Sequence, residues 1–437
     1  MGKWIFAQAE RGGFAVYLKR KVYDELVAWK KRPGHSTLEI SGARQVGKTY
    51  IVNRFADEQY NQKIYINLLD LSGELFLEQY RELWQEMKAG QRYQNPIYEL
   101  IKRYRPDFED SRNTVVIIDE IQESADIYNR IREFTRTLKC DFIITGSYLG
   151  RILKKEFKYS SGDLEYLEIC TLGFEEFLTA INSMDLYEEM SLCGESDTKV
   201  YQELHKLYND YCTIGGYPSV VLKYLENAPL QDCQAELLKI IRLFTNESRR
   251  YFEDSFSEEL QGLVVKDYSS NITKASVNRA IDWLYSSGVI GFAGKLPECS
   301  LLDFKAKARC YFTDIGLANY FLTKAGIPKD AVSGIINENF VYLDLRRRIA
   351  HPSEIALESP AFATLGNGEI DFYVKTLRSE RTYAVEVKSG KNSGKTATEA
   401  LKKKKVDYVL YAKGSTYGGK TGHTITIPIY GISKFRF

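Results

Sequence analysis

The chain is poor in the residues that build metal and disulfide frameworks. Only four histidines occur among 437 residues, and the seven cysteines are an odd number without a C-x-x-C pair. These counts disfavour a histidine-rich metal centre and a zinc or disulfide framework. We therefore expect the cysteines to be reduced and mostly buried thiols.

Long apolar runs are also absent. No stretch approaches the roughly 20 uninterrupted apolar residues of a membrane span, and the first residues, MGKWIFAQAERGG, lack the apolar region of a secretory signal. A hydrophobic fraction of 44% still permits large cores, and the length suggests roughly two to four domains. We expect a cytoplasmic protein without a membrane partner.

The net charge of +2 hides an uneven distribution. Residues 381–437 contain 12 Lys and Arg against 3 Asp and Glu, a sum of +9, which leaves −7 for residues 1–380. Basic contacts to phosphate supply most non-specific nucleic-acid affinity, so this segment is a candidate for contact with DNA. The run Lys402–Lys405 is equally well explained as the solvated face of a helix.

One segment predicts a nucleotide site. The sequence GARQVGKT is a complete G-x-x-x-x-G-K-[ST] loop after a strand-like run, Thr37 to Ile40. In such loops backbone N–H groups and the next helix N-terminus hold phosphates, the lysine bridges the β- and γ-phosphates, and the hydroxyl ligates Mg²⁺. The expected ATP-binding residues are Gly42, Ala43, Arg44, Gln45, Val46, Gly47, Lys48, Thr49 and Tyr50. Of these, Lys48 is also a candidate catalytic residue and Thr49 a candidate metal ligand.

A second motif, VVIIDE, supplies two carboxylates. Four consecutive β-branched residues predict a strand buried on both faces of a parallel sheet, whose carboxyl end lies where such sheets bind ligands. We expect Asp119 to hold Mg²⁺ and Glu120 to take a proton from the attacking water. The alternative is a strand that merely stops at a charged turn.

A third strand ends in ITGS. Ser147, or Thr145 beside it, fits the position of a polar residue that contacts the γ-phosphate or the attacking water, although ordinary turn chemistry also explains the sequence. No guanine-reading N-K-x-D sequence follows the strands, which favours ATP over GTP.

The domain organisation follows from changes in pattern along the chain. Strands alternate with helices up to Ser147, which predicts an α/β fold with a doubly wound parallel sheet. We assign residues 1–170, with a helix over 13–33, to this P-loop domain and the mostly helical residues 171–260 to a lid. Residues 261–328 resemble a winged helix, a fold that reads DNA or serves only for docking. Residues 329–437 are assigned to a C-terminal α/β domain.

A second chemical site is predicted near the C-terminus, where the sequence reads GEIDFYV and then YAVEVKSGK. Side chains two apart in a strand point the same way, so Glu386 and Lys388 share a face, with Asp371 in the strand before. The two carboxylates can share Mg²⁺ or Mn²⁺ while Lys388 orients or deprotonates water for phosphodiester hydrolysis. Glu338, in a helix upstream, is a further candidate ligand. The alternative is a surface ion pair between Glu386 and Lys388.

The combined motifs resemble a known group. GARQVGKT, DEIQ, ITGS, GGYP, YFTDIGLANYF, ENFVYLDL and EVKSGK, in this order, resemble the bacterial and archaeal AAA-type ATPases that carry a C-terminal PD-(D/E)xK nuclease-like domain. The resemblance implies a polar sensor at Ser147 and a nuclease-like set of Glu338, Asp371, Glu386 and Lys388. Where relatives commonly carry a Gly-Arg pair, this chain reads Ser161-Gly162-Asp163, so no standard arginine finger is assigned, and Arg151 is a weak substitute.

The leading hypothesis is a Mg²⁺-dependent ATPase that acts on DNA as a homo-oligomer. The first alternative is an ATP-gated, metal-dependent DNA nuclease used in repair or defence. The second is a regulatory switch in which the nucleotide state controls binding to a protein partner.

Overall fold

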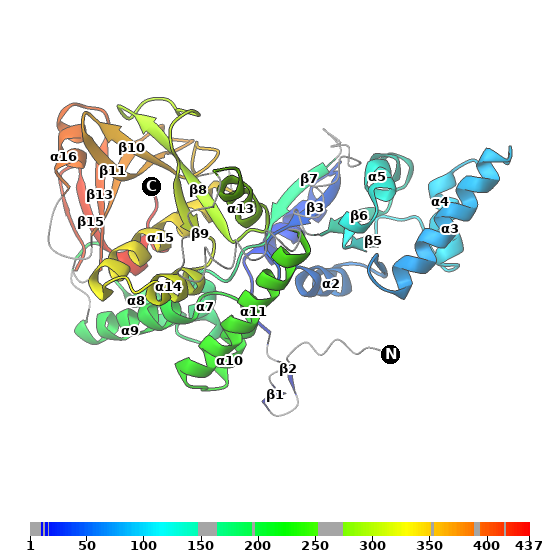
Figure 1. Ribbon diagram of the computed structural model, residues 1–437, viewed down its shortest axis with the longest axis horizontal. Coiled ribbons are helices and arrows are strands. Elements are labelled where there is room, and N and C mark those ends of the chain that lie inside the picture. Colours follow the sequence, from blue (N-terminus) through cyan, green and yellow to red (C-terminus); the bar gives the residue numbers. More distant parts are fainter. Residues whose placement is uncertain are drawn as a thin grey trace. The chain divides into compact units, whose positions relative to one another are not determined.

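The computed structural model contains two compact units, whose elements are labelled in Figure 1. The N-terminal unit consists of Arg20–Cys170 and Ile281–Gly288, and the C-terminal unit is built mainly from Thr171–Ala280 and Val289–Phe437. The structure describes residues 10–11, 14–15, 17–146, 164–194, 197–251, 274–350, 354–388, 394–414 and 417–437. None of the helices in these ranges combines the length and the apolar composition needed to cross a bilayer.

The N-terminal unit is built on a sheet of parallel strands in the order β4-β5-β6-β3-β7. Its strands are β3 (Thr37–Ser41), β4 (Gln62–Asn67), β5 (Thr114–Asp119), β6 (Asp141–Thr145) and β7 (Leu164–Glu168). The parallel sheet confirms the α/β fold that the alternating pattern predicted. Because β6 lies between β3 and β5, one strand separates β5, which ends in the acidic residues, from β3, which leads into the phosphate loop.

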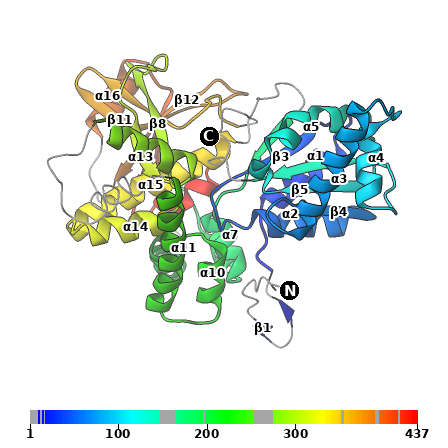
Figure 2. The same ribbon diagram turned by 45° about the vertical axis from the view of Figure 1, so that its right-hand side comes forward.

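Helices cover both faces of this sheet, with α2 (Lys48–Gln59) and α5 (Ala125–Thr137) on opposite sides (Figures 1 and 2). The strand β5 reads TVVIID and is buried along its whole length, as expected for a strand covered by helices on both sides. Beyond β4, α3 (Leu71–Lys88) packs against α4 (Pro96–Tyr104). The sequence sets their starts, because Asp70 and Asn95 accept hydrogen bonds from backbone N–H groups of the first turns.

The first helix is shorter than the sequence predicted. Instead of spanning residues 13–33, α1 covers Val22–Lys31, and Phe14–Ala15 form the strand β2, paired with β1 (Glu10–Arg11). The helix ends where Arg32 adopts an extended conformation, because the residue before a proline, here Pro33, is sterically biased away from helix.

A buried carboxylate joins two turns in the helical part of the C-terminal unit. The helices of this part are α7 (Phe174–Ala180), α8 (Met184–Glu189), α9 (Thr198–Ile214), α10 (Pro218–Leu225), α11 (Leu230–Tyr251), α14 (Ile315–Lys324) and α15 (Lys329–Ile349). The helix α13 (Lys274–Ser286) has residues in both units. Asp314 is fully buried and accepts hydrogen bonds from Gly316 N at 2.9 Å and Leu317 N at 3.1 Å, which caps α14. It also accepts one from Gly216 N at 2.8 Å. The motifs GGYP and TDIGL, about 100 residues apart, are therefore joined in one contact.

The C-terminal unit contains a mixed sheet in the order β14-β15-β13-β12-β11-β10-β8-β9. Its strands are β8 (Ile290–Pro297), β9 (Arg309–Phe312), β10 (Ala361–Leu365), β11 (Gly368–Lys375), β12 (Thr382–Lys388), β13 (Tyr408–Lys413), β14 (Gly419–Thr421) and β15 (Thr424–Pro428). With α15 before β10 and α16 (Lys395–Lys402) between β12 and β13, the chain has the expected order of helix, three strands, helix and strand. The short helix η2 (Ile429–Lys434) follows.

This sheet corrects one expected boundary. The strands β8 and β9, assigned above to a separate winged helix over residues 261–328, belong to the same sheet as the C-terminal strands. One edge of β8 pairs with β9 and the other pairs in parallel with β10, which satisfies backbone groups that a free hairpin would leave at an open edge. Residues 252–273 of the expected domain lie outside the described residues.

Candidate functional site

The phosphate loop joins β3 to α2 through backbone conformations that favour glycine. Gly42 has φ +142° and Gly47 has φ +91°, a region that side chains with a Cβ rarely adopt. A Cβ on Gly42 would also lie 2.2 Å from the Ile169 carbonyl oxygen. The loop can therefore turn closely against the segment that follows β7, as a phosphate-binding loop requires.

The lysine and threonine of the loop begin the helix α2. Lys48 Nζ donates hydrogen bonds to the carbonyl oxygens of Gly42 and Ala43, both at 2.9 Å, so its ammonium lies over the loop. Thr49 Oγ1 donates to Asp119 Oδ2 at 2.9 Å. The two sequence motifs, 70 residues apart, thus meet at the carboxyl edge of the sheet.

Asp119 accepts hydrogen bonds from four groups. Besides Thr49, Tyr65 OH donates to Oδ2 at 2.7 Å, Thr145 Oγ1 donates to Oδ1, and Glu120 N donates to Oδ1 at 3.0 Å. Burial and the charge of Asp119 raise the pKa of the Tyr65 phenol, so it remains a donor at neutral pH. Three neighbouring side chains therefore fix the orientation of this carboxylate.

Glu120 is held beside Asp119 in an unusual backbone conformation. Its φ of +56° is a left-handed conformation that costs a non-glycine residue free energy. Its carboxylate accepts a hydrogen bond from Gln122 Nε2. A Cβ on Gly146 would lie 2.4 Å from Gln122 Oε1, so the glycine of ITGS leaves room for the side chain that orients Glu120.

Sequence reasoning missed two side chains of this site. Tyr65 follows the ordinary alternation of β4, and only the pairing of β4 with β5 brings it to Asp119. Arg20 is buried and donates to the carbonyl oxygens of Val46, at 3.1 Å, and Cys170, at 2.5 Å, which ties the phosphate loop to the chain after β7. Neither position carries a local sequence signal, because each acts through a contact between distant segments.

Several expected residues are not part of these contacts. Arg44 and Tyr50 are exposed on the loop and the first turn of α2. Ser147, Arg151 and the segment 161–163 lie outside the described residues, so their predicted roles remain predictions. Thr145, considered above as the alternative to Ser147, is buried and is occupied by its bond to Asp119.

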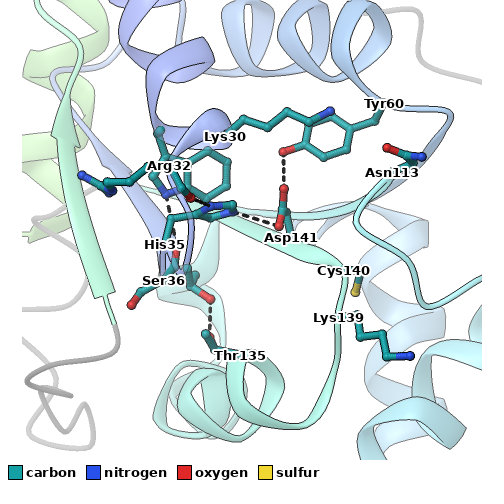
Figure 3. Close-up of polar contacts among 12 residues, drawn as sticks. Lys30, Arg32, His35, Ser36, Tyr60, Asn113, Thr135, Lys139, Cys140 and Asp141 are labelled. Carbon is teal, nitrogen blue, oxygen red and sulfur yellow. Dashed lines mark hydrogen bonds and ion pairs between the residues drawn. The ribbon is translucent and has the colours of Figure 1, made fainter.

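A separate polar cluster lies at the amino ends of the strands, opposite the ends that carry the phosphate loop (Figure 3). Asp141 Oδ2 accepts a hydrogen bond from Tyr60 OH at 2.6 Å, and Asp141 Oδ1 lies 2.9 Å from His35 Nε2. His35 Nδ1 lies 2.8 Å from the Arg32 carbonyl oxygen. Because Asp141 begins β6 whereas Thr145 ends it, this cluster joins the segment before β3 to β6 and is distinct from the phosphate-loop site.

The C-terminal site brings three of its four predicted residues together. Lys388 Nζ lies 2.6 Å from Glu386 Oε2 and 3.3 Å from Asp371 Oδ2. Asp371 Oδ2 also accepts a hydrogen bond from Val387 N at 2.8 Å. Burial would lower the pKa of Lys388, but the neighbouring carboxylates outweigh burial and raise it. Lys388 is therefore a cation, and not a ready base, in this arrangement.

Glu386 has an unused carboxylate oxygen. Its side chain is only 2% exposed, and its Oε1 has no hydrogen-bond partner among the residues that the structure describes. Burial, followed by the charge of Asp371, raises the pKa of this carboxyl. A buried oxygen without a donor is costly, and a divalent cation is one group that would satisfy it.

Glu338 pairs with a cation that the sequence analysis did not consider. Arg309 Nη1 lies 3.1 Å from Glu338 Oε1 and 4.0 Å from Asp371 Oδ1, and Tyr311 OH donates to Glu338 Oε1 at 2.6 Å. Burial raises the pKa of Glu338. In the described part of the chain, no group of three or more His, Cys, Asp or Glu residues is arranged to hold a metal ion. Glu338 therefore does not complete a three-carboxylate cluster with Asp371 and Glu386, because Arg309 lies between it and Asp371.

Comparison with protein families gives matches to two different parts of the chain. Residues 35–178 match the family described as AAA domain. This part of the chain is an AAA-type P-loop ATPase domain. Residues 333–430 match the family described as domain of unknown function (DUF4143), which assigns no chemistry to the C-terminal site.

Similar individual proteins add little about activity. An uncharacterized protein of Haemophilus influenzae is 28% identical over 184 residues, which cover 42% of this chain and 40% of that protein. The match thus spans less than half of that relative's length.

Two solved structures are also similar: the ORC2 protein of Aeropyrum pernix and the RuvB Holliday junction branch migration motor of Thermotoga maritima. The first has a TM-score of 0.32 and 11% identity and covers 76% of this chain and 96% of its own. The second has a TM-score of 0.30 and 11% identity, with coverages of 63% and 89%. Matches with TM-scores this low support no conclusion about this chain.

Proposed function

We propose that the chain is a Mg²⁺-dependent ATPase that acts on DNA. The observation that carries the proposal is the contact between the AAA domain's two motifs, in which Thr49 Oγ1 donates to Asp119 Oδ2 at 2.9 Å. The hydroxyl and carboxylate oxygens are the hard ligands that Mg²⁺ prefers. Lys48, at the start of α2, supplies the positive charge next to the same edge of the sheet.

The residues of the site support a division of roles. Lys48 and the backbone N–H groups of the loop would bind the phosphates, and Thr49 and Asp119 would hold Mg²⁺, which, when bound, neutralises charge on the phosphates. Glu120, oriented by Gln122, would accept the proton of the attacking water on its free carboxylate oxygen. Tyr65 and Thr145 would keep Asp119 in position.

The test is ATP turnover by Lys48→Ala. We expect turnover to fall by at least about 100-fold, because a lysine that neutralises transferred phosphate contributes on this order. The matched control is Lys102→Ala in the same unit, whose ammonium donates to the Phe108 carbonyl oxygen at 3.1 Å and which should leave turnover unchanged. Turnover that survives Lys48→Ala would overturn the assignment.

A second candidate function is metal-dependent cleavage of DNA by the C-terminal site. It is favoured by Glu386 Oε1, the buried oxygen without a donor, beside Asp371 and Lys388. Purified protein with Mn²⁺ and duplex, single-stranded or branched DNA should show cleavage that Asp371→Ala abolishes. The control is Glu369→Ala, two residues earlier on β11, which pairs with Arg309 at 2.6 Å. Absence of cleavage, or cleavage that survives Asp371→Ala, would reject the nuclease.

The homo-oligomer is part of this proposal, whereas the regulatory switch that binds a protein partner is its alternative, and two measurements test them. Light scattering with and without ATP would report assembly, and DNA binding at several salt concentrations would report phosphate contacts. An absence of DNA binding at low salt would favour the switch that binds a protein partner.

A further inference from the structure

The turn between β8 and β9 exposes two large apolar side chains. In this segment, residues 298–308, which we name the tip turn, Leu301 is 83% exposed and Phe304 is 87% exposed. These are the two largest exposed fractions among the large hydrophobic residues of the described chain. A single exposed leucine needs no explanation, but two side chains projecting from one short turn do.

The backbone of the tip turn is held by specific contacts. Asp303 N donates to the Lys295 carbonyl oxygen at 2.9 Å, and Asp303 Oδ1 accepts a hydrogen bond from Lys305 N at 2.9 Å. Glu298 Oε1 accepts one from Gly366 N, at 2.8 Å, in the connection between β10 and β11. Leu301 and Phe304 are therefore presented by an ordered turn, which lowers the entropy lost when they contact a partner.

The same turn packs beside the lysine run of α16. Cys299 is buried in one hydrophobic cluster with Ala400, two residues before that run, and Val406, directly after it. The charges agree with this packing: Glu399 and then Glu298 raise the pKa of Lys403. Figures 1 and 2 both show α16 and the end of β8 in the upper part of the C-terminal sheet.

The surface around the two apolar side chains is positively charged. Within residues 298–308 and 399–405 the exposed lysines are Lys305, Lys307, Lys402, Lys403, Lys404 and Lys405, and the exposed carboxylates are Glu298, Asp303 and Glu399, so the sum is 6 − 3, or +3. The carboxylates are engaged locally, Glu298 and Asp303 with backbone N–H groups and Glu399 with Lys403 at 2.6 Å. The remaining lysines are available to a polyanion.

We propose that the tip turn is a nucleic-acid contact in which Phe304 and Leu301 pack against bases while the surrounding lysines contact phosphates. Apolar wedges of one or two side chains between bases are a known mode of DNA contact, and aromatic side chains stack on unpaired bases of any sequence. Only two apolar side chains project here, whereas membrane-surface binding uses a longer apolar face. Unpaired bases cost less to reach, so single-stranded or forked DNA binds more tightly than continuous duplex.

This inference deepens the DNA part of the proposed function and rests on it. The experiment is fluorescence anisotropy of labelled single-stranded, forked and duplex oligonucleotides with the full chain and its variants. Phe304→Ala should weaken binding to single-stranded and forked DNA by about 10-fold, the effect of losing one stacked base. Lys305→Gln together with Lys307→Gln should reduce the salt slope of single-strand binding by about 1.4, from about 0.7 for each phosphate contact.

The control variant is Leu377→Ala, which removes a half-exposed leucine elsewhere in the C-terminal unit and should leave DNA binding unchanged. Urea unfolding of Phe304→Ala should match that of the wild type, which shows that the C-terminal unit of the variant is folded. If the wild type binds DNA and Phe304→Ala binds equally well, the tip turn is not the contact, but the proposed function stands. If the wild type binds no DNA at low salt, the proposed action on DNA fails. Sedimentation with phosphatidylserine vesicles that depends on Phe304, without such dependence for DNA, would replace this proposal by a membrane contact.

Discussion

Removing the Tyr65 hydroxyl, which donates a hydrogen bond to Asp119, should raise the Mg²⁺ concentration that the ATPase site needs. Asp119 Oδ2 accepts only two of the four hydrogen bonds, from Thr49 and from Tyr65 OH at 2.7 Å. Tyr65→Phe deletes the second bond without touching any group expected to contact ATP. The carboxylate then keeps the bond from Thr49 on Oδ2 and the bonds from Thr145 and Glu120 N on Oδ1, but it loses one of the three side chains that fix its orientation.

The size of the effect follows from this geometry. A hydrogen bond to a charged group contributes about 1.5–3 kcal/mol, and losing a partner that orients a metal ligand typically lowers metal affinity by about 10–100-fold. In steady-state ATP turnover with free Mg²⁺ as the variable, the concentration for half-maximal rate should rise by about 10-fold. At saturating Mg²⁺ most of the rate should return, because Lys48 and Glu120 are unchanged.

Tyr60→Phe is a closely matched control. Tyr60 OH donates to Asp141 Oδ2 at 2.6 Å, so this variant also removes a tyrosine-to-aspartate bond from the same sheet, but at the opposite edge (Figure 3). It should lower stability without moving the Mg²⁺ dependence. If Tyr65→Phe leaves the half-saturating Mg²⁺ concentration unchanged, or if Tyr60→Phe shifts it equally, the role given to Tyr65 is refuted.

Three further perturbations test other contacts. Asp314→Asn should lower the free energy of unfolding by about 1–3 kcal/mol, because the amide cannot accept from both α14 and Gly216 N; urea unfolding measures the loss. Burial raises the pKa of Asp314 above its ordinary value, so its stabilising contribution is complete at low pH and is lost as pH rises through the raised value. The deficit of the variant should accordingly be larger at pH 4 than at pH 7, and an equal deficit at both values would contradict this. Glu120→Gln should bind ATP normally in a filtration assay while turnover falls by about 100-fold or more; a rate near the wild-type rate would exclude it as the base. Gly42→Ala should abolish ATP binding, because its Cβ would meet the Ile169 carbonyl oxygen at 2.2 Å, and normal binding by calorimetry would show that the loop tolerates the change.

The parts of the fold predicted from the sequence are those with a local pattern. The β-branched run in TVVIID predicted a buried strand, and the glycines before Lys48 predicted a phosphate-binding loop. The parallel sheet and the contact between Thr49 and Asp119 could therefore be predicted. The contacts of Tyr65 and Arg20 were not, because an alternating tyrosine and an arginine before a helix are ordinary in any fold. They acquire roles only through pairing or packing with segments up to 150 residues away.

The C-terminal unit shows the same limit. The order of elements around Asp371, Glu386 and Lys388 was predictable from the alternation of the strands. The partner of Glu338 was not, because Arg309 comes from β9, which the sequence alone placed in another domain. Only the parallel pairing of β8 with β10, about 70 residues apart, brings that arginine to the carboxylates.

The contact made by Asp314 has a consequence for how such chains diverge. Its two oxygens accept hydrogen bonds from the backbone of two separate turns, and a Cβ on Gly215 would lie 2.3 Å from Asp314 Oδ1. The sequence of one turn therefore cannot change without a change in the other. A homologue that lacks the carboxylate must also have a different GGYP turn. Among homologous sequences, positions 215 and 314 should accordingly change together or not at all. A glycine and an aspartate at these two positions would then indicate this arrangement of helices even at low overall identity.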